Sequence, residues 1–271
     1  MPQCACTLPQ RLLPKCATGP NASAHAPLRA TFVALRDPAS VGVVLAAGFE
    51  VVVIDREHGG MNPETLGALI SAAHAAGGFA IVRISEVARA AVQDALEAGA
   101  DGILAPMVEN EKQAMRLVSF CKYPPEGTRG FHPLTAGSQY GLIPGHAVPS
   151  SANERIFIGA QIESAAGIMN CAKIAEVPGV HQLFLGPGDL ALSLGVPPGA
   201  RALVGAATRI AAATQSAGKS YGTFVFSSTE AKSAAEQGAM LIVAGADIAL
   251  LQSSARQMSA EMKRVLEPGA D

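Results

Sequence analysis

Ionisable side chains follow directly after two apolar, β-prone stretches of the chain. Asp55-Arg56-Glu57-His58 comes after Val51–Ile54, and Arg83 ends the run that begins at Ala80. Desolvating unpaired charge inside a strand is costly, so these groups belong at strand ends. A salt-bridged surface loop would explain the first cluster, and an ion pair would explain Arg83. The functional interpretation is an active-site loop beside a guanidinium suited to a carboxylate or another oxyanion.

A second pair of stretches supplies carboxylates. Gln161 and Glu163 end the apolar run from Ile156, and residues two apart in a strand point to the same side. Asp189 follows the tight turn Gly186-Pro187-Gly188, whose backbone N–H groups could face an anion. Asp189 could instead be a simple helix N-cap. Two carboxylates at successive strand ends, completed by water, would make an open oxygen-ligand site for Mg²⁺ or Mn²⁺.

Other chemistries lack their signatures. The chain has no G-x-S-x-G elbow, no Walker A loop and no G-x-G-x-x-G fingerprint. Neither Lys173 nor Lys219 closes an apolar strand, which disfavours a covalent-lysine mechanism. The net charge is −2, Trp is absent and aromatic residues make up 4%, so we expect no nucleic-acid or membrane-surface partner.

Eight short apolar runs must position these groups, and stretches with helical periodicity such as Pro63–Ala76 and Ala88–Ala98 separate them. Runs that are nearly continuously apolar are typical of parallel strands covered on both faces. We therefore predict a single-domain (β/α)₈ TIM barrel over residues 28–271, with a doubly wound open sheet as the alternative. The runs are Leu28–Leu35, Glu50–Asp55, Ala80–Ile84, Gly102–Val108, Ile156–Ile162, Gln182–Leu185, Ser220–Phe226 and Met240–Ala244.

Residues 1–27 are rich in proline and have no apolar periodicity, so we expect a disordered leader. The leader is poor in acids, which leaves mitochondrial targeting as a minor alternative, although its prolines oppose the amphipathic helix of a transit peptide. No apolar run approaches the roughly 20 residues that span a bilayer. The five cysteines form neither a paired zinc set nor a disulfide framework, and we expect a cytoplasmic protein.

Six short motifs occur in order along the chain. They are Asp55-Arg-Glu-His58, Val82-Arg83, Pro106-Met-Val-Glu109, Tyr123-Pro-Pro-Glu-Gly-Thr-Arg-Gly130, Gln161-Ile-Glu163 and Gly186-Pro-Gly-Asp-Leu190. With these motifs the chain resembles, from Leu28 to Met258, the metal-dependent (class II) pyruvate aldolases of the HpcH/HpaI type, which include 4-hydroxy-2-oxoheptanedioate and 2-keto-3-deoxy sugar acid aldolases. The resemblance implies a (β/α)₈ barrel and a homohexamer whose C-terminal helices are exchanged between subunits.

The resemblance also implies the ligands of the site. Glu163 and Asp189 would bind a divalent metal such as Mg²⁺, Mn²⁺ or Co²⁺, and pyruvate would chelate it through its keto and carboxylate oxygens. Backbone groups at Gly188 and Asp189 would hold the substrate carboxylate, with Gln161 beside the substrate.

Three more roles complete the implied reaction, which is the reversible cleavage of a 4-hydroxy-2-oxo acid to pyruvate and an aldehyde through the metal-bound pyruvate enolate. Arg83 would stabilise the enolate oxygen and His58 would be the base. Glu97 stands where the family usually has an aspartate that supports this histidine. A metal and a guanidinium together suit a developing enolate charge, and a histidine near its ordinary pKa suits proton transfer at neutral pH.

Several alternatives stay open. Oxaloacetate decarboxylation uses the same enolate, and a CoA-ester lyase of the citrate-lyase type would need a basic surface for the CoA phosphates. A catalytically silent barrel serving as an assembly subunit is the alternative from a different class. The loop after Gly130 departs from the family pattern, and His132 there is either a site residue or a loop histidine.

Overall fold

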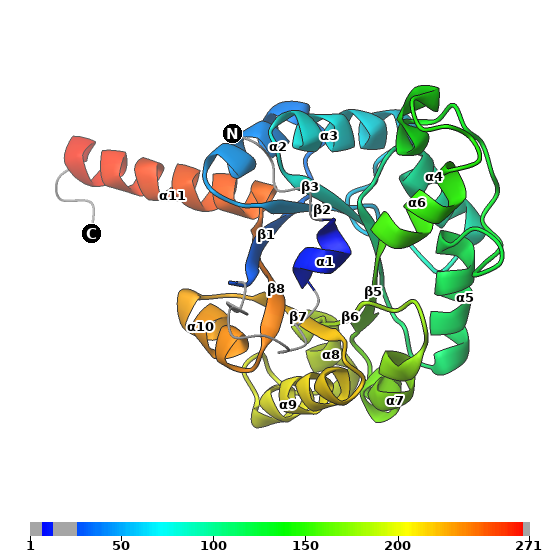
Figure 1. The fold of residues 1–271 in the computed structure, drawn as a ribbon. Coiled ribbons are helices and arrows are strands. Elements are labelled where there is room, and N and C mark those ends of the chain that lie inside the picture. Colours follow the sequence, from blue (N-terminus) through cyan, green and yellow to red (C-terminus); the bar gives the residue numbers. More distant parts are fainter. Residues whose placement is uncertain (1–6, 13–25, 268–271) are drawn as a thin grey trace, which may run out of the picture.

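The computed structural model describes residues 7–12 and 26–267, which contain a closed barrel of eight parallel strands in the order β1 to β8 (Figure 1). Each strand falls within or beside its predicted run, so the barrel is confirmed and the open sheet is excluded. The strands are β1 (Leu28–Val33), β2 (Val51–Asp55), β3 (Phe79–Arg83), β4 (Gly102–Ala105), β5 (Phe157–Ile162), β6 (Gln182–Leu185), β7 (Ser220–Val225) and β8 (Ala239–Ala246).

Helices surround the strands, and the two helical stretches named from the sequence correspond to α3 and α4 (Figure 1). Side-chain oxygens of Asn62, Asn110 and Ser164 cap the first turns of α3, α5 and α7. The elements are α1 (Leu8–Leu12), α2 (Pro38–Ala46), α3 (Pro63–Ala75), α4 (Arg89–Glu97), α5 (Glu111–Cys121), the 3₁₀ helix η1 (Ala136–Gly141), α6 (Val148–Arg155), α7 (Ala165–Glu176), α8 (Pro187–Leu194), α9 (Arg201–Ser216), α10 (Ser228–Glu236) and α11 (Asp247–Leu266).

The apolar core has two layers, one on each face of the strands. Val53, Leu104 and Phe157 belong to a cluster in the barrel interior, whereas Val52 and Ile103 pack in the layer between strands and helices. Both faces of each strand are therefore covered, which explains why the strands are continuously apolar instead of alternating.

Helix α1 corrects the prediction of a wholly disordered leader. Leu8 and Leu12, four residues apart and thus on one helix face, are 1% and 0% exposed and pack with Val51 and Phe157 in the barrel interior. Arg11 of α1 also forms an ion pair of 3.1 Å with Glu50, which directly precedes β2. The helix closes the N-terminal end of the barrel, where it lies at the centre of the ring (Figure 1). Residues 1–6 and 13–25 of the predicted leader lie outside the described residues.

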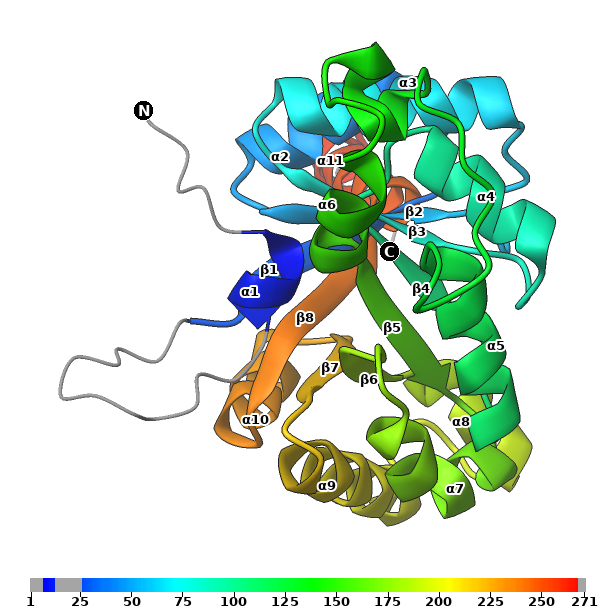
Figure 2. The same ribbon diagram turned by 45° about the vertical axis from the view of Figure 1, so that its right-hand side comes forward.

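Helix α11 extends away from the barrel (Figure 1), and in the turned view of Figure 2 it lies behind the other elements. Its first residue, Asp247, is buried and accepts hydrogen bonds from the backbone N–H groups of Ala34 and Leu35, which anchors the helix to the end of β1. Beyond that anchor the helix exposes Leu251, Val265 and other apolar side chains. In the part of the chain that the structure describes, no helix combines the length and apolarity needed to cross a membrane.

Candidate active site

Asp55 and Arg83 stand at the carboxyl ends of β2 and β3 and are register partners across these adjacent strands. Arg83 Nε donates to Asp55 Oδ1 at 2.9 Å, and Arg83 Nη2 donates to Asp55 Oδ2 at 2.7 Å. The Arg83 guanidinium also lies 3.2 Å from the carboxylate of Glu57 and 4.5 Å from the ring centre of Phe32. The guanidinium is thus held on three sides at the mouth of the barrel.

The charge of Arg83 is maintained by its partners. Burial alone would lower the pKa of Arg83, but the hydrogen bonds and negative charge of Asp55, with contributions from Glu57 and Glu163, raise it instead. The residue is therefore a permanent positive charge within electrostatic range of Glu163, which lies after the end of β5.

Glu163 is a buried carboxylate with fixed partners. Its Oε1 accepts a 2.7 Å hydrogen bond from the backbone N–H of Met107, and its Oε2 accepts from Gln161 Nε2. Burial, together with the negative charges of Glu57 and Asp189, raises the pKa of Glu163 to about 7, although these two hydrogen bonds act in the opposite direction. Asp189 lies in the first turn of α8 and is exposed.

The chemistry of this donor set fits a divalent cation. Three carboxylates, Glu57, Glu163 and Asp189, lie within electrostatic range of one another, so a cation would relieve their repulsion. The turn at Gly186 must stay without a side chain, because a Cβ there would come within 2.5 Å of Glu163 Oε2. Among residues 7–12 and 26–267 no group of three or more His, Cys, Asp or Glu side chains is arranged to hold a metal. Glu163 and Asp189 are the two carboxylates of this set that the sequence predicts as metal ligands, and they would suit an open site completed by water or substrate.

His58 lies on the same end of the barrel, in the loop after β2. Its backbone N–H donates to Asp55 Oδ1 at 3.3 Å, and its Nε2 is 3.8 Å from Glu57 Oε2. The side chain is 66% exposed, so it can reach a substrate that enters from solvent. Gly188 is exposed in the first turn of α8, and a Cβ on it would meet nothing within 4 Å, which leaves its backbone open to a ligand.

Glu97 does not support His58 within one chain. It is the last residue of α4, which leads from the carboxyl end of β3 back to the amino end of β4, so it lies at the opposite end of the barrel from His58. Its carboxylate accepts a 3.0 Å hydrogen bond from Gln93 Nε2, one turn earlier. The sequence gives the position of Glu97 along a helix but not the end of the barrel that the helix reaches, so the role of Glu97 beside this histidine stays a prediction. His132 is exposed, and its Nδ1 accepts from the backbone N–H of Leu134.

Two contributors, Phe32 and Met107, were given no role in the site from the sequence. Phe32 lies inside an apolar strand and carries no signal beyond being aromatic. Met107 contributes a backbone N–H, and its left-handed φ of 52° is set by the turn after β4. Neither a packing face nor a backbone donor can be read from residue types, so only the fold identifies them.

A closed parallel barrel with acids, an arginine and a histidine at the carboxyl ends of its strands defines a barrel enzyme. Residues 29–254 match the family model for HpcH/HpaI aldolase/citrate lyase, and the chain belongs to this family. The family is generally divalent-metal-dependent, and the protein is a lyase of the aldolase type.

Relatives with known names share this assignment. The chain is 30% identical over 248 residues to a 5-keto-4-deoxy-D-glucarate aldolase of Klebsiella pneumoniae, covering 89% of this chain and 94% of the relative. It is 40% identical over 144 residues to a 2-dehydro-3,6-dideoxy-6-sulfogluconate aldolase of Pseudomonas putida, covering 53% and 56%. The crystal structure of an HpcH/HpaI aldolase/citrate lyase family protein from Burkholderia cenocepacia is similar, with a TM-score of 0.83, 29% identity and coverage of 88% and 95%.

Proposed function

We propose that this protein is a divalent-metal-dependent carbon–carbon lyase that reversibly cleaves a 4-hydroxy-2-oxo acid to pyruvate and an aldehyde. The observation that carries the proposal is the meeting of Arg83, held by Asp55, with the buried Glu163 at one end of the barrel. The relatives named as aldolases of keto-deoxy sugar acids support this substrate class.

The residues that would hold the metal are Glu163 and Asp189, with Mg²⁺, Mn²⁺ or Co²⁺ as candidates. When bound, the metal would act as a Lewis acid and lower the energy of the negative charge that develops on the 2-oxo group. The hydrogen bond from Met107 N–H fixes the direction of the Glu163 carboxylate before any ligand arrives.

Arg83 would stabilise the developing enolate oxygen from the protein side. Its orientation is already set by Asp55 and Phe32, so little reorganisation accompanies the reaction. Backbone groups at Gly188 and Asp189 would hold the substrate carboxylate, and Gln161, which donates to Glu163, would lie beside the substrate.

His58 would move the proton. In cleavage it takes the proton of the 4-hydroxyl group, whose O–H electrons form the aldehyde C=O bond as the C3–C4 bond breaks. The C3–C4 electron pair passes to the 2-oxo group as the enolate, and protonation at C3 gives pyruvate. The exposed position of His58 suits proton exchange with water between turnovers.

We further propose that the chain forms a homo-oligomer, with the hexamer implied by the resemblance as the expected state. Support comes from α11, which extends from the barrel and exposes apolar residues along its length. An exposed apolar face on a projecting helix is stabilised when a second copy covers it. Light scattering on Leu251→Glu and Val265→Glu variants tests this, with smaller assemblies expected and an unchanged mass contradicting the proposal.

The test of the activity is exchange of the pyruvate methyl protons in D₂O, followed by NMR. Chelator-treated protein should show no exchange until Mg²⁺, Mn²⁺ or Co²⁺ is added, and Glu163→Gln should abolish the metal-dependent exchange. Glu230→Gln removes an exposed acid on α10 and should exchange like the wild type. Absence of exchange with every metal would contradict the proposal, and release of CO₂ from oxaloacetate would identify the decarboxylase alternative.

A further inference from the structure

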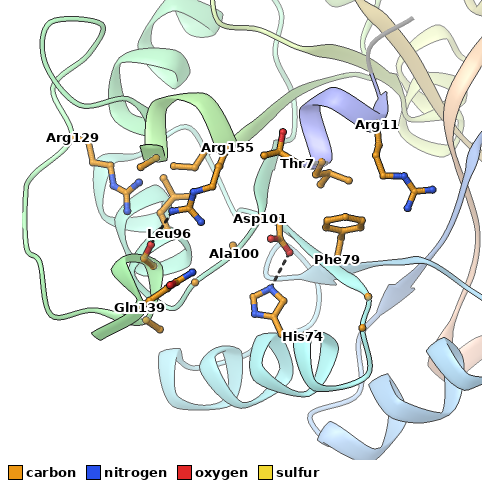
Figure 3. A pocket seen from close by; sticks show the side chains of 18 residues that line it. Thr7, Arg11, His74, Phe79, Leu96, Ala100, Asp101, Arg129, Gln139 and Arg155 are labelled. Carbon is orange, nitrogen blue, oxygen red and sulfur yellow. Dashed lines mark hydrogen bonds and ion pairs between the residues drawn. The ribbon is translucent and has the colours of Figure 1, made fainter. Parts of the chain in front are cut away.

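A cavity of about 730 Å³ lies at the amino ends of the strands, opposite the candidate active site (Figure 3). Phe79 at the start of β3, Asp101 just before β4 and Ile156 just before β5 line it, which fixes its position at this end. Helix α1 forms one wall through Leu8 and Arg11, and η1 forms another. The cavity is therefore separate from Arg83 and Glu163.

Arg129 lines this cavity and is only 7% exposed. Its guanidinium lies 4.6 Å from the ring centre of Tyr123, and its buried Nε has no hydrogen-bond partner among the described residues. No acid in the described chain forms an ion pair with it, although Glu97 attracts it from a greater distance. A buried charge is costly without a partner of opposite sign, so the site favours an anion.

The Arg155 side chain lines the same cavity (Figure 3) and adds a second positive charge that forms no ion pair with an acid among the described residues. Its guanidinium donates to the Ser151 backbone carbonyl and hydroxyl at 3.3 and 3.2 Å, and to the Gly137 carbonyl at 3.5 Å. All of these acceptors are neutral. Burial lowers the pKa of Arg129, and the charge of Arg155 contributes in the same direction, so the two guanidinium groups repel each other.

The remaining polar groups do not cancel this charge. Asp101, an acid on the lining, accepts from His74 Nε2 at 3.0 Å and from the Ala80 N–H at 2.8 Å, and its hydrogen bond raises the pKa of His74. Arg11 pairs with Glu50 outside the lining. The buried hydroxyl of Thr7 also has no partner among the described residues. The cavity thus combines a hydroxyl without a hydrogen-bond partner and two guanidinium groups without an acidic partner among the described residues.

We propose that this cavity binds the phosphate group of a small phosphorylated molecule, with Arg129 and Arg155 as its principal ligands. Guanidinium groups bind phosphate oxygens through paired charge-assisted hydrogen bonds. A phosphate dianion matches two guanidinium charges, whereas a single carboxylate matches one. The volume of the cavity exceeds that of a bare phosphate, so the rest of the phosphorylated molecule would lie between α1 and η1.

Calorimetry on the full chain tests the proposal. The protein is first treated with EDTA, so that phosphate cannot bind through a metal, and is titrated with inorganic phosphate, with glycerol phosphate and with succinate. The wild type should bind both phosphates, and Arg155→Gln should weaken both by about tenfold or more, the scale of a lost charge-assisted contact. Arg116→Gln, which removes an exposed arginine on α5, is the matched control and should bind like the wild type.

A second variant and a second measurement distinguish a loss of phosphate binding from a loss of folding. Arg129→Lys keeps the charge but removes the guanidinium fork, and should bind phosphate more weakly than the wild type while it still unfolds in one cooperative transition. Phosphate should raise the melting temperature of the wild type more than that of Arg155→Gln. Failure of the wild type to bind either phosphate, equal binding by Arg155→Gln, or a preference for succinate would each overturn the proposal.

Discussion

Arg83 and Asp55 occupy matching positions on adjacent strands and are joined by two hydrogen bonds of 2.9 and 2.7 Å, with their side chains 10% and 7% exposed. The parallel register places the guanidinium group of Arg83 opposite the two carboxylate oxygens of Asp55. The pair therefore directs the guanidinium at the barrel mouth and also removes two charges from water, which makes each residue dependent on the other.

Removing one member of this pair should destabilise the protein. We expect Asp55→Ala to lower the free energy of unfolding by about 3–5 kcal/mol, because the buried Arg83 loses its main counter-charge. The Arg56–Asp94 pair, at 3.1 Å but with Asp94 41% exposed, is the matched control. Asp94→Ala should cost no more than about 1 kcal/mol. Urea denaturation measures both free energies of unfolding. Equal losses in the two variants would contradict a larger stabilising contribution from the buried Asp55–Arg83 pair.

Metal binding should depend on both proposed ligands. Glu163→Gln and Asp189→Asn each remove one negative ligand, so the affinity for Mn²⁺ measured by calorimetry should fall at least about tenfold in each variant. His58→Ala should bind Mn²⁺ like the wild type and lose turnover. Wild-type affinity in the Asp189→Asn variant would show that Asp189 is not a ligand.

His181 should make stability depend on pH. Its Nδ1 accepts from the Ile158 N–H at 3.0 Å, and burial lowers its pKa to about 4. Between about pH 4 and 6.5 the unfolded chain binds more protons at this site than the folded chain, so stability falls as the pH falls through that window. The loss is at most about 3 kcal/mol, since one pKa unit corresponds to about 1.4 kcal/mol.

The His181→Asn variant keeps an acceptor for Ile158 but cannot titrate, so its stability should change less between pH 7 and 4. His146→Asn removes an exposed histidine and should follow the wild-type curve. Chemical denaturation at several pH values gives the comparison. Parallel curves for wild type and His181→Asn would contradict the assignment.

Helix α1 should contribute to stability even though it lies within the predicted leader. Leu12→Ala removes a fully buried side chain from the barrel interior and should cost about 2–5 kcal/mol. Val43→Ala on the exposed face of α2 should cost less than about 1 kcal/mol. Both are compared at one protein concentration, because association shifts apparent stability. An unchanged unfolding midpoint for Leu12→Ala would mean that α1 does not pack in the barrel.

The sequence alone determined the parts of this protein that depend on local pattern. Continuous apolar runs located the strands to within a few residues, and the charges after Ile54, Val82 and Ile162 indicated which end of the barrel carries chemistry. Both follow because burial on two faces and the cost of desolvated charge act on neighbouring residues.

Tertiary structure decided what depends on residues far apart in the chain. It placed Phe32 over Arg83 and the Met107 N–H against Glu163, and it separated Glu97 from His58 by the length of the barrel. It also turned Leu8 and Leu12 of a proline-rich segment into a plug for the barrel interior. The physical reason is that a short helix is stable only when another surface covers its apolar face, and that surface exists only after the eight strands have closed.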